Sequence, residues 1–346
     1  MRLYYIDALK GLACIIVFIF HFNAAFIVDG VALQRIPNSI SFIVDGSWAV
    51  YLFLLLSGFS ITMSLQRKQQ YQDHIVKRYF RLALPVSLIQ IIAYIMGLIG
   101  LYTNGVVSDL TNNVWFGHFY TDFSIVTLFK GLIFAVPWGN EYSAPLIAPA
   151  WMLTYVFWGT FLVVCLQIAS NNLKNKKTVI LYFLFIIICL SKFSFYYISV
   201  ILGSLIAHFY YAIISRNGQI GMYFLSIICF VASLICYAMH LHPILSTALM
   251  ALFFFLNPWL QNVMSKKHML FLGDISLWVY LIHWPVICSI GGSIFLKYYD
   301  SSPESSYYLA LFVCLFVTIL ISYLFKIYFD PLFKNIVNNF VLYIKS

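Results

Sequence analysis

Apolar runs of about twenty residues recur along almost the whole chain, and they constrain its fold more than any other feature. A run of this length crosses the hydrocarbon core of a bilayer as an α-helix, because backbone polar groups in lipid must pair within their own segment. The composition agrees, since 63% of the 346 residues are hydrophobic and only 9% are charged. We therefore predict an all-α, polytopic membrane protein whose residues 1–346 form a single integral domain, with no appended soluble domain.

The apolar runs and the polar segments between them predict about ten transmembrane helices. The fifth is short and is the weakest crossing. We expect a basic loop at residues 66–81 and a re-entrant or interfacial segment at residues 125–136. The predicted spans cover residues 4–28, 46–65, 82–102, 150–169, 179–192, 195–214, 220–239, 244–264, 269–296 and 307–329.

Lysine and arginine are unevenly distributed over the predicted loops. If the loops alternate across the membrane, 16 of the 20 basic residues lie on the side of both termini, and the other four are Arg35, Lys130, Lys192 and Lys297. The positive-inside rule then places both termini in the cytoplasm, with the protein integral to the cell membrane. The net charge of +9 is thus explained by basic loops on one side of the membrane. We therefore expect membrane lipid as a partner and no nucleic acid.

Three ionisable residues, Asp7, Lys10 and His21, interrupt the first apolar run. On a helix, Lys10 and His21 lie within about 20° of one another and about 16 Å apart along the axis, with Asp7 one turn before Lys10. Ionisable groups inside a membrane are costly and usually mark function, so this stripe is the candidate active centre. The alternatives are that Lys10 is a snorkelling interfacial anchor and that His21 is a hydrogen-bonded structural histidine.

Neither the cysteines nor the histidines predict a metal site. All seven cysteines lie in apolar runs, without the spacing of metal ligands or of a disulfide framework. No pair among the eight histidines has a convincing metal-ligand spacing. We expect no bound metal.

Four sequence patterns follow one another along the chain. They are an Asp-x-Leu-Lys-Gly run followed by a histidine, a Ser-Gly-Phe segment, an Arg-x-x-Arg pair, and a final Gly-x-x-Ser…Tyr-Leu-x-His-x-Pro element. In order and spacing, they resemble the motifs of the membrane-bound acyltransferase 3 family across nearly the whole chain. The matching residues are Asp7, Leu9, Lys10, Gly11 and His21; Phe53, Ser57, Gly58 and Phe59; Arg78, Arg81 and Pro85; and Gly273, Ser276, Tyr280, Leu281, His283 and Pro285.

The chain departs from the family pattern after Trp151. This residue opens a segment that resembles the family's tryptophan-led helix, which normally places a glutamate five positions later, and here that position is Val156. The loss puts in doubt any role taken over from that glutamate. Glu141, upstream, is the one substitute we consider, and no spacing supports it.

The resemblance implies transfer of an acyl group, commonly acetyl, from acetyl-CoA or another acyl-CoA to a hydroxyl of an envelope polysaccharide or lipid-linked sugar. Acyl-CoA is then a donor substrate, and we expect no permanently bound cofactor. His21 is the first choice for the base or nucleophile, because imidazole suits either role near neutral pH. Arg78, Arg81 and Lys10 would hold the CoA phosphates on the cytoplasmic side.

The remaining motif residues have less specific expected roles. His283 would orient or polarise the acceptor hydroxyl, or is purely structural. Asp7 joins His21 and His283 as a catalytic candidate, and the candidate substrate-binding residues are Ser57, Trp151, Glu141 and Tyr280. Ser57 is more often a packing residue in such a position, and Arg78 and Arg81 could be ordinary positive-inside anchors.

Two other classes of function compete with the acyltransferase. A transporter or flippase of a lipid-linked or small polar substrate would also line its path with buried polar groups. A non-catalytic membrane sensor is favoured only by Val156, which stands where the family usually has a glutamate. Aromatic residues in the long predicted outer segment could bind sugar rings or form an interfacial belt, and these are Trp115, Tyr120, Trp138 and Tyr142.

Overall fold

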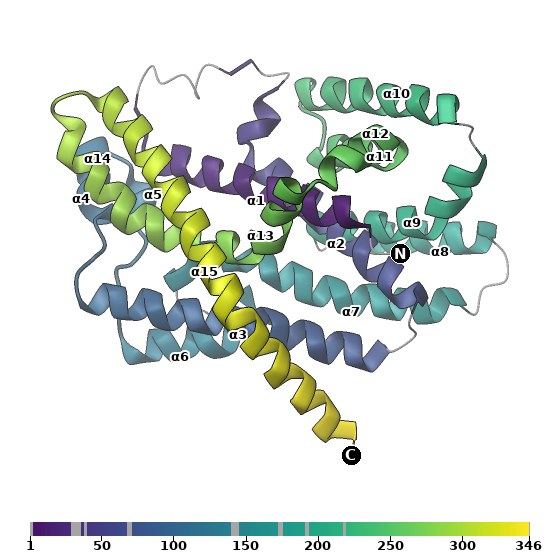
Figure 1. The fold of residues 1–346 in the computed structure, drawn as a ribbon, viewed down its shortest axis with the longest axis horizontal. Coiled ribbons are helices and arrows are strands. Elements are labelled where there is room, and N and C mark those ends of the chain that lie inside the picture. Colours follow the sequence, from purple (N-terminus) through teal and green to yellow (C-terminus); the bar gives the residue numbers. More distant parts are fainter. Residues whose placement is uncertain are drawn as a thin grey trace. The chain divides into compact units, whose positions relative to one another are not determined.

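The computed structural model describes residues 3–28, 36–37, 40–67, 71–139, 145–171, 176–190, 194–216 and 219–345, all of whose regular elements are helical (Figure 1). The longer helices are α1 (Tyr4–Ala25), α2 (Gly46–Arg67), α3 (Tyr71–Leu98), α7 (Trp151–Asn171), α8 (Lys176–Leu190), α9 (Phe195–Arg216), α10 (Gln219–Ala238), α11 (Pro243–Leu256), α13 (Lys267–Val286) and α15 (Pro303–Lys345). The shorter elements are η2 (Ser41–Val44), α4 (Asn104–Thr111), α5 (Val114–Gly117), α6 (Ile125–Phe134), η4 (Pro145–Ala150), α12 (Pro258–Met264), η5 (Ile287–Gly291) and α14 (Gly292–Tyr299).

The helices confirm the predicted all-α, polytopic class. Within the described residues, seven helical stretches are long and apolar enough to cross a membrane, or eight if one bent pair counts as a span. The count of ten predicted spans is not confirmed. The predicted fifth span corresponds to α8, which has only 15 residues.

One predicted loop is wrong. The basic segment 66–81 is not a loop throughout, because α3 already begins at Tyr71. Beyond the predicted last span, α15 continues as a helix to Lys345. Within the predicted span 244–264, the chain bends by 92° between α11 and α12. Asn257 is extended there and its side chain caps the Leu260 N–H, while Pro258 cannot continue the hydrogen-bond ladder of α11.

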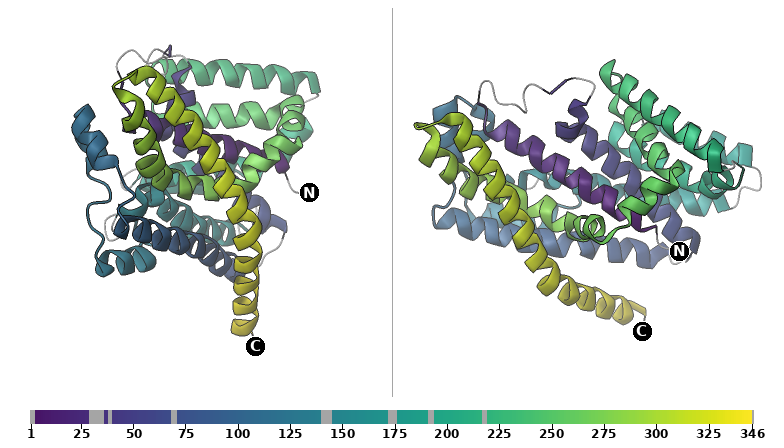
Figure 2. Two further views of the ribbon diagram at one scale, coloured as in Figure 1. Left: turned by 60° about the vertical axis from the view of Figure 1, so that its left-hand side comes forward. Right: turned by 45° about the horizontal axis from the view of Figure 1, so that its top comes forward.

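The chain divides into two compact units. Unit 1 comprises Met1–Ala13, Pro37–Val76 and Tyr155–Asp274, and unit 2 comprises Cys14–Ile36, Lys77–Thr154 and Ile275–Ser346. In unit 1, α2 lies along α9, and α10 lies along α11 (Figure 2). In unit 2, the end of α14 turns back so that α15 packs against it (Figure 2).

Glycines explain the close approach of α2 and α9 in unit 1. A Cβ atom on Gly58 would overlap the backbone of Val200, and one on Gly203 would overlap the carbonyl of Leu55. Small residues commonly allow such contacts between membrane helices. The glycine of the Ser-Gly-Phe motif therefore has a packing role.

Aromatic rings fill the core of unit 2 around the second half of α1. Phe18 and Phe22 lie on one face of α1, Phe26 directly follows the helix, and all three are fully buried. Asn113, just before α5, donates hydrogen bonds from Nδ2 to the carbonyls of Ala24 (2.7 Å) and Ala25 (3.1 Å). These bonds satisfy carbonyls at the end of α1 and anchor α5 beside it.

Candidate functional site

Two histidines from distant parts of the sequence meet in unit 2. His21 on α1 and His283 on α13 lie 262 positions apart, and His21 Nδ1 is 3.0 Å from His283 Nε2. Their ring planes differ by 19°. His283 is only 1% exposed, whereas His21 is half-buried. The structure thus brings together two residues that the sequence predicted separately as catalytic candidates.

A backbone carbonyl determines which nitrogens of this pair carry protons. His283 Nδ1 lies 3.1 Å from the Val279 carbonyl oxygen, which can only accept, so Nδ1 of His283 must be the donor. Neutral His283 then has an unprotonated Nε2 that accepts from Nδ1–H of His21. In neutral His21 the remaining Nε2 therefore carries a lone pair. It has no hydrogen-bond partner among the described residues.

Aromatic rings surround the histidine pair. Phe18 contacts the edge of His283 at 6.3 Å between ring centroids. His21 contacts Phe20 at 5.4 Å and Trp284 at 5.3 Å. This apolar setting strengthens the hydrogen bond between the imidazoles, because water competes less for it.

The first half of α1 belongs to unit 1 and holds the other two ionisable residues of the predicted stripe. Lys10 Nζ donates to Ser60 Oγ at 2.9 Å, and Ser60 Oγ in turn donates to the Leu56 carbonyl at 2.7 Å. Asp7 is half-buried, and a Cβ atom on Gly273 would overlap its backbone. The glycine of the final motif therefore permits close packing of α13 on α1. The predicted roles of Asp7 in catalysis and Lys10 in CoA binding stay predictions.

Arg78 and Arg81 lie within α3, in unit 2, and not in a loop as predicted. Their separation of three residues places them side by side on the helix surface. Arg81 is exposed. Arg78 is half-buried, and its enclosed Nε has no hydrogen-bond partner among the described residues. The pair offers two neighbouring guanidinium groups to an anion.

A family model described as an acyltransferase domain matches residues 3–327. The chain belongs to the acyltransferase 3 family. This confirms the resemblance that the four motifs predicted, makes the protein a membrane acyltransferase, and does not favour the transporter alternative. No curated protein and no solved structure matches the chain significantly.

The final acyltransferase 3 motif also contributes Tyr280, which lies inside unit 2. Its ring is 5.9 Å from that of His283, and its hydroxyl donates to the Pro149 carbonyl. Pro149 lies in η4, two residues before Trp151, which is half-buried and is the first residue of α7. Tyr280 therefore joins the histidine helix to the start of the tryptophan-led helix. The predicted substrate-binding roles of Tyr280 and Trp151 stay predictions.

Three other residues of the acyltransferase 3 pattern have different surroundings. Ser57 is 1% exposed within α2, and its hydroxyl has no partner among the described residues. Val156, where the family usually has glutamate, is 2% exposed, so this position is enclosed in α7. Glu141 lies outside the described residues. The predicted substrate-binding roles of Ser57 and Glu141 stay predictions.

The aromatic residues of the long predicted outer segment are not equally available to a sugar. Trp115 is exposed and packs edge-on against Trp284, with 5.6 Å between ring centroids. Tyr120 is buried and stacks on Tyr102 at 3.7 Å, so one face of its ring is covered. Trp138 is exposed, and Tyr142 lies outside the described residues.

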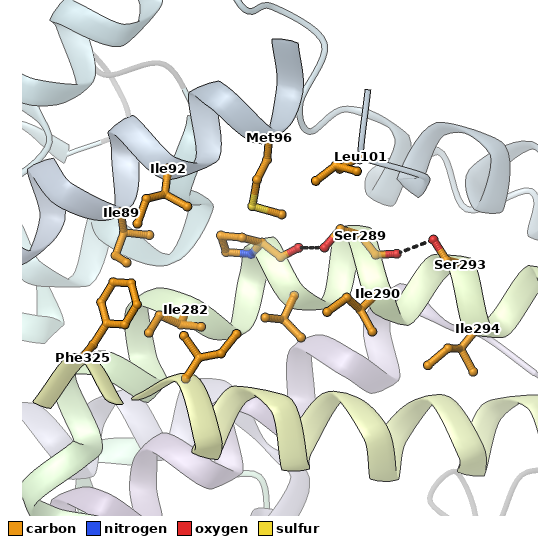
Figure 3. Close-up of a pocket in the computed structure, with 13 residues that line it drawn as sticks. Ile89, Ile92, Met96, Leu101, Ile282, Ser289, Ile290, Ser293, Ile294 and Phe325 are labelled. Carbon is orange, nitrogen blue, oxygen red and sulfur yellow. Dashed lines mark hydrogen bonds between the residues drawn. The ribbon is translucent and has the colours of Figure 1, made fainter. Parts of the chain in front are cut away.

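Sequence reasoning missed two cavities in unit 2. The larger, about 360 Å³, is almost wholly apolar, and its two serine hydroxyls donate to helix carbonyls, Ser289 to Pro285 at 2.6 Å and Ser293 to Ser289 at 2.9 Å (Figure 3). Figure 3 shows Ile89, Ile92 and Met96 of α3 facing Ile282 and Ile290 across it. No ionisable residue lines this cavity, so it can hold hydrocarbon but supplies no acid or base.

The smaller cavity, about 220 Å³, is lined by glycines and by polar side chains such as Tyr102, Asn104 and Thr121. Phe119 also lines it and contacts Trp284 at 4.8 Å between ring centroids. The larger cavity has no sequence signal, because it is lined by residues from three segments far apart in the chain. The smaller cavity is lined by residues 97–123 alone, and it depends on how this stretch folds back on itself.

Proposed function

We propose that this membrane acyltransferase uses acyl-CoA, commonly acetyl-CoA, to acylate a hydroxyl of an envelope polysaccharide or lipid-linked sugar. The observation that carries the proposal is the hydrogen bond between His21 Nδ1 and His283 Nε2, which leaves a basic nitrogen on His21. Transfer to a hydroxyl requires a group that removes its proton, and a neutral imidazole does this near neutral pH.

The two histidines have different roles in this proposal. His21 takes the acceptor proton through Nε2 and becomes an imidazolium that still donates from Nδ1 to His283. His283 is a positioning residue, because its own Nδ1–H is engaged with the Val279 carbonyl and its Nε2 maintains the reactive tautomer of His21. This arrangement parallels the way a third group orients the base in other acyl-transfer sites.

Arg78 and Arg81 support the choice of donor. CoA carries several phosphates, and arginine binds phosphate oxygens through paired N–H donors. Two adjacent guanidinium groups on α3 match this requirement, with Lys10 as a third candidate. The basic excess predicted for the side of both termini supports a cytoplasmic location for these residues, where CoA is made.

The test is transfer of label by the purified full-length protein from [14C]acetyl-CoA to candidate glycans, free and lipid-linked. We expect base-labile label on the glycan and release of CoA thiol in equal amounts. A His21→Asn protein prepared in the same way controls for contaminating transferases. If correctly folded protein labels no hydroxyl acceptor with any acyl-CoA, the proposal is wrong.

A further inference from the structure

Trp284 holds a buried hydrogen-bond donor that no described residue accepts. The side chain is fully buried, and no acceptor for its Nε1–H lies among the described residues. Buried N–H groups nearly always have a partner, so an exception next to a proposed reaction centre requires a reason.

The indole lies directly against the proposed base. The ring of Trp284 contacts His21 edge-on, at 5.3 Å between centroids and 66° between planes. Of the described rings in contact with His21, only those of His283 and Trp284 carry N–H groups, and the N–H of His283 is engaged with the Val279 carbonyl. Trp284 therefore has the one unengaged donor among these rings.

Another tryptophan on α13 shows that the same helix can satisfy a buried indole. Trp278, six residues earlier, is 1% exposed, and its Nε1–H donates to Asp330 Oδ1 at 2.9 Å. Burial of the two rings is nearly equal, so the lack of a partner at Trp284 is not a general result of burying tryptophan in this helix. It is specific to the position beside His21.

The other neighbours of Trp284 enclose it without offering an acceptor in their side chains. Trp115, Phe116 and Phe119 contact its ring at 5.6, 6.0 and 4.8 Å between centroids. An apolar enclosure strengthens any hydrogen bond that the indole makes, because water does not compete for the proton. His21, which also contacts the indole, is half-buried, so a reacting group can approach the contact from the exposed part of His21.

We propose that Trp284 is a catalytic residue whose Nε1–H donates to the carbonyl oxygen of the acyl group as that oxygen becomes negatively charged. The inference rests on the proposed function. An indole donates but does not accept, so it stabilises an anion without competing with His21 for the acceptor proton. A buried donor that is bonded to no described residue does not have to break an existing hydrogen bond when the charge develops.

The step is balanced as follows. The acceptor oxygen attacks the thioester carbonyl carbon while His21 Nε2 takes the hydroxyl proton, and the carbonyl π electrons move onto the oxygen that Trp284 Nε1–H binds. When these electrons return, the carbon–sulfur bond breaks. The CoA sulfur leaves with the bonding pair and takes the proton from the His21 imidazolium. The products are the ester and CoA thiol, and both side chains regain their starting state.

The decisive variant is Trp284→Phe, with Trp278→Phe as its matched control. We expect Trp284→Phe to lower kcat by about 10²–10³-fold, the usual effect of removing one oxyanion donor, with an unchanged or higher Tm because no acceptor loses its partner. Trp278→Phe should lower Tm, since Asp330 loses a donor, and should leave kcat of the folded protein unchanged. The isosteric benzothienylalanine at position 284, with sulfur in place of N–H, gives the same comparison if phenylalanine packs poorly.

A second measurement does not depend on turnover. In the His21→Asn background, bound [13C]acetyl-CoA should show a lower carbonyl stretching frequency than in the His21→Asn/Trp284→Phe protein, because a hydrogen bond weakens the C=O bond. Equal frequencies, a kcat within twofold of wild type, or a loss of Tm as large as that of Trp278→Phe would overturn the inference. In each of these cases, label transfer by the wild-type protein would leave the proposed function intact.

Discussion

His21 donates from Nδ1 to Nε2 of His283 across 3.0 Å, and the Val279 carbonyl accepts the other N–H of His283. The direction of both bonds follows from the carbonyl alone, since it has no proton to give. This relationship makes the two ring nitrogens of His21 chemically distinct. It also means that an amide side chain can replace either histidine, so that the hydrogen bond between the two positions is kept while one imidazole is removed.

His21→Asn should lower the rate of transfer by about 10²–10⁴-fold, the usual contribution of a general base. The asparagine Nδ2 occupies roughly the place of His21 Nδ1 and can still donate to His283, so we expect Tm to change little. His21→Ala should be equally inactive but less stable, because the buried Nε2 of His283 loses its donor. Initial rates and thermal unfolding in detergent test this, and turnover near wild type in either variant would remove His21 from the reaction.

The variants His283→Gln and His283→Leu test whether His283 acts by positioning His21 or only by filling space. The glutamine Oε1 can accept from His21 Nδ1 and maintain its tautomer, so we expect about a tenfold loss of kcat. Leucine offers no acceptor, and loss of the correct tautomer should lower kcat by on the order of 10³-fold or more. Both variants should retain the KM for acyl-CoA. Equal losses of kcat in the two variants would show that His283 does not act through its Nε2.

Arg78→Ala and Arg81→Ala should weaken binding of CoA donors more than that of truncated thioesters such as S-acetylpantetheine. Each lost arginine–phosphate contact is expected to raise the KM for acetyl-CoA by about tenfold or more, since hydrogen bonds to charged groups contribute about 1.5–3 kcal/mol. Lys297→Ala, which removes an exposed charge from α14, is the control. If KM rises equally for full-length and truncated donors, the arginines have a structural role.

The sequence predicted what depends on composition and on local pattern, and missed what depends on packing. Its apolar runs indicated the membrane class correctly, and the motifs indicated the family. Hydropathy did not reveal the bend at Asn257, because the two helices that flank it are together apolar enough to cross a membrane. The start of α3 was also missed, because the charged residues before Arg81 are as compatible with an interfacial helix as with a loop.

For the candidate site, too, the sequence predicted the residues of local motifs but not the contacts that depend on packing. His21 and His283 were each recognisable from a motif, but a hydrogen bond between residues 262 positions apart depends on how α1 and α13 pack. Trp284 drew no attention in the sequence, since a tryptophan in an apolar run usually fills a core or an interface. Its unsatisfied N–H is a property of its neighbours and has no signal in the chain itself.

Gly58→Ala should destabilise unit 1, because the added Cβ atom would overlap the backbone of Val200, which cannot rotate away as a side chain can. We expect a loss of about 1–3 kcal/mol or more, as for other overpacked positions. Gly221→Ala in α10 is the matched control, since its Cβ meets nothing within 4 Å and alanine favours a helix. Thermal unfolding compares the two, and an unchanged Tm in Gly58→Ala would contradict the observed contact.

Donor and acceptor should enter from opposite sides of the membrane. The positive-inside rule predicts that Arg78 and Arg81 face the cytoplasm and that the segment containing Trp115 lies outside. In sealed proteoliposomes of one orientation, acetyl-CoA on the side of the termini should acylate a glycan enclosed on the other side. Transfer only when both substrates share the cytoplasmic compartment would exclude this route without excluding the acyltransferase.

The π-helical segment η5, which follows the final motif, bears on how relatives of this chain should be aligned. A π turn contains one more residue than an α turn before its backbone hydrogen bond closes. Each residue of a helix turns the chain by about 100°, so the side chains after Gly291 point about 100° away from the directions that a regular helix continuing from His283 and Pro285 would give them. A homologue with a regular helix at this place would lack one residue within a membrane helix. The gap in such an alignment therefore belongs between Ile287 and Gly291, and moving it into the loop before Pro303 would misassign every position of α14.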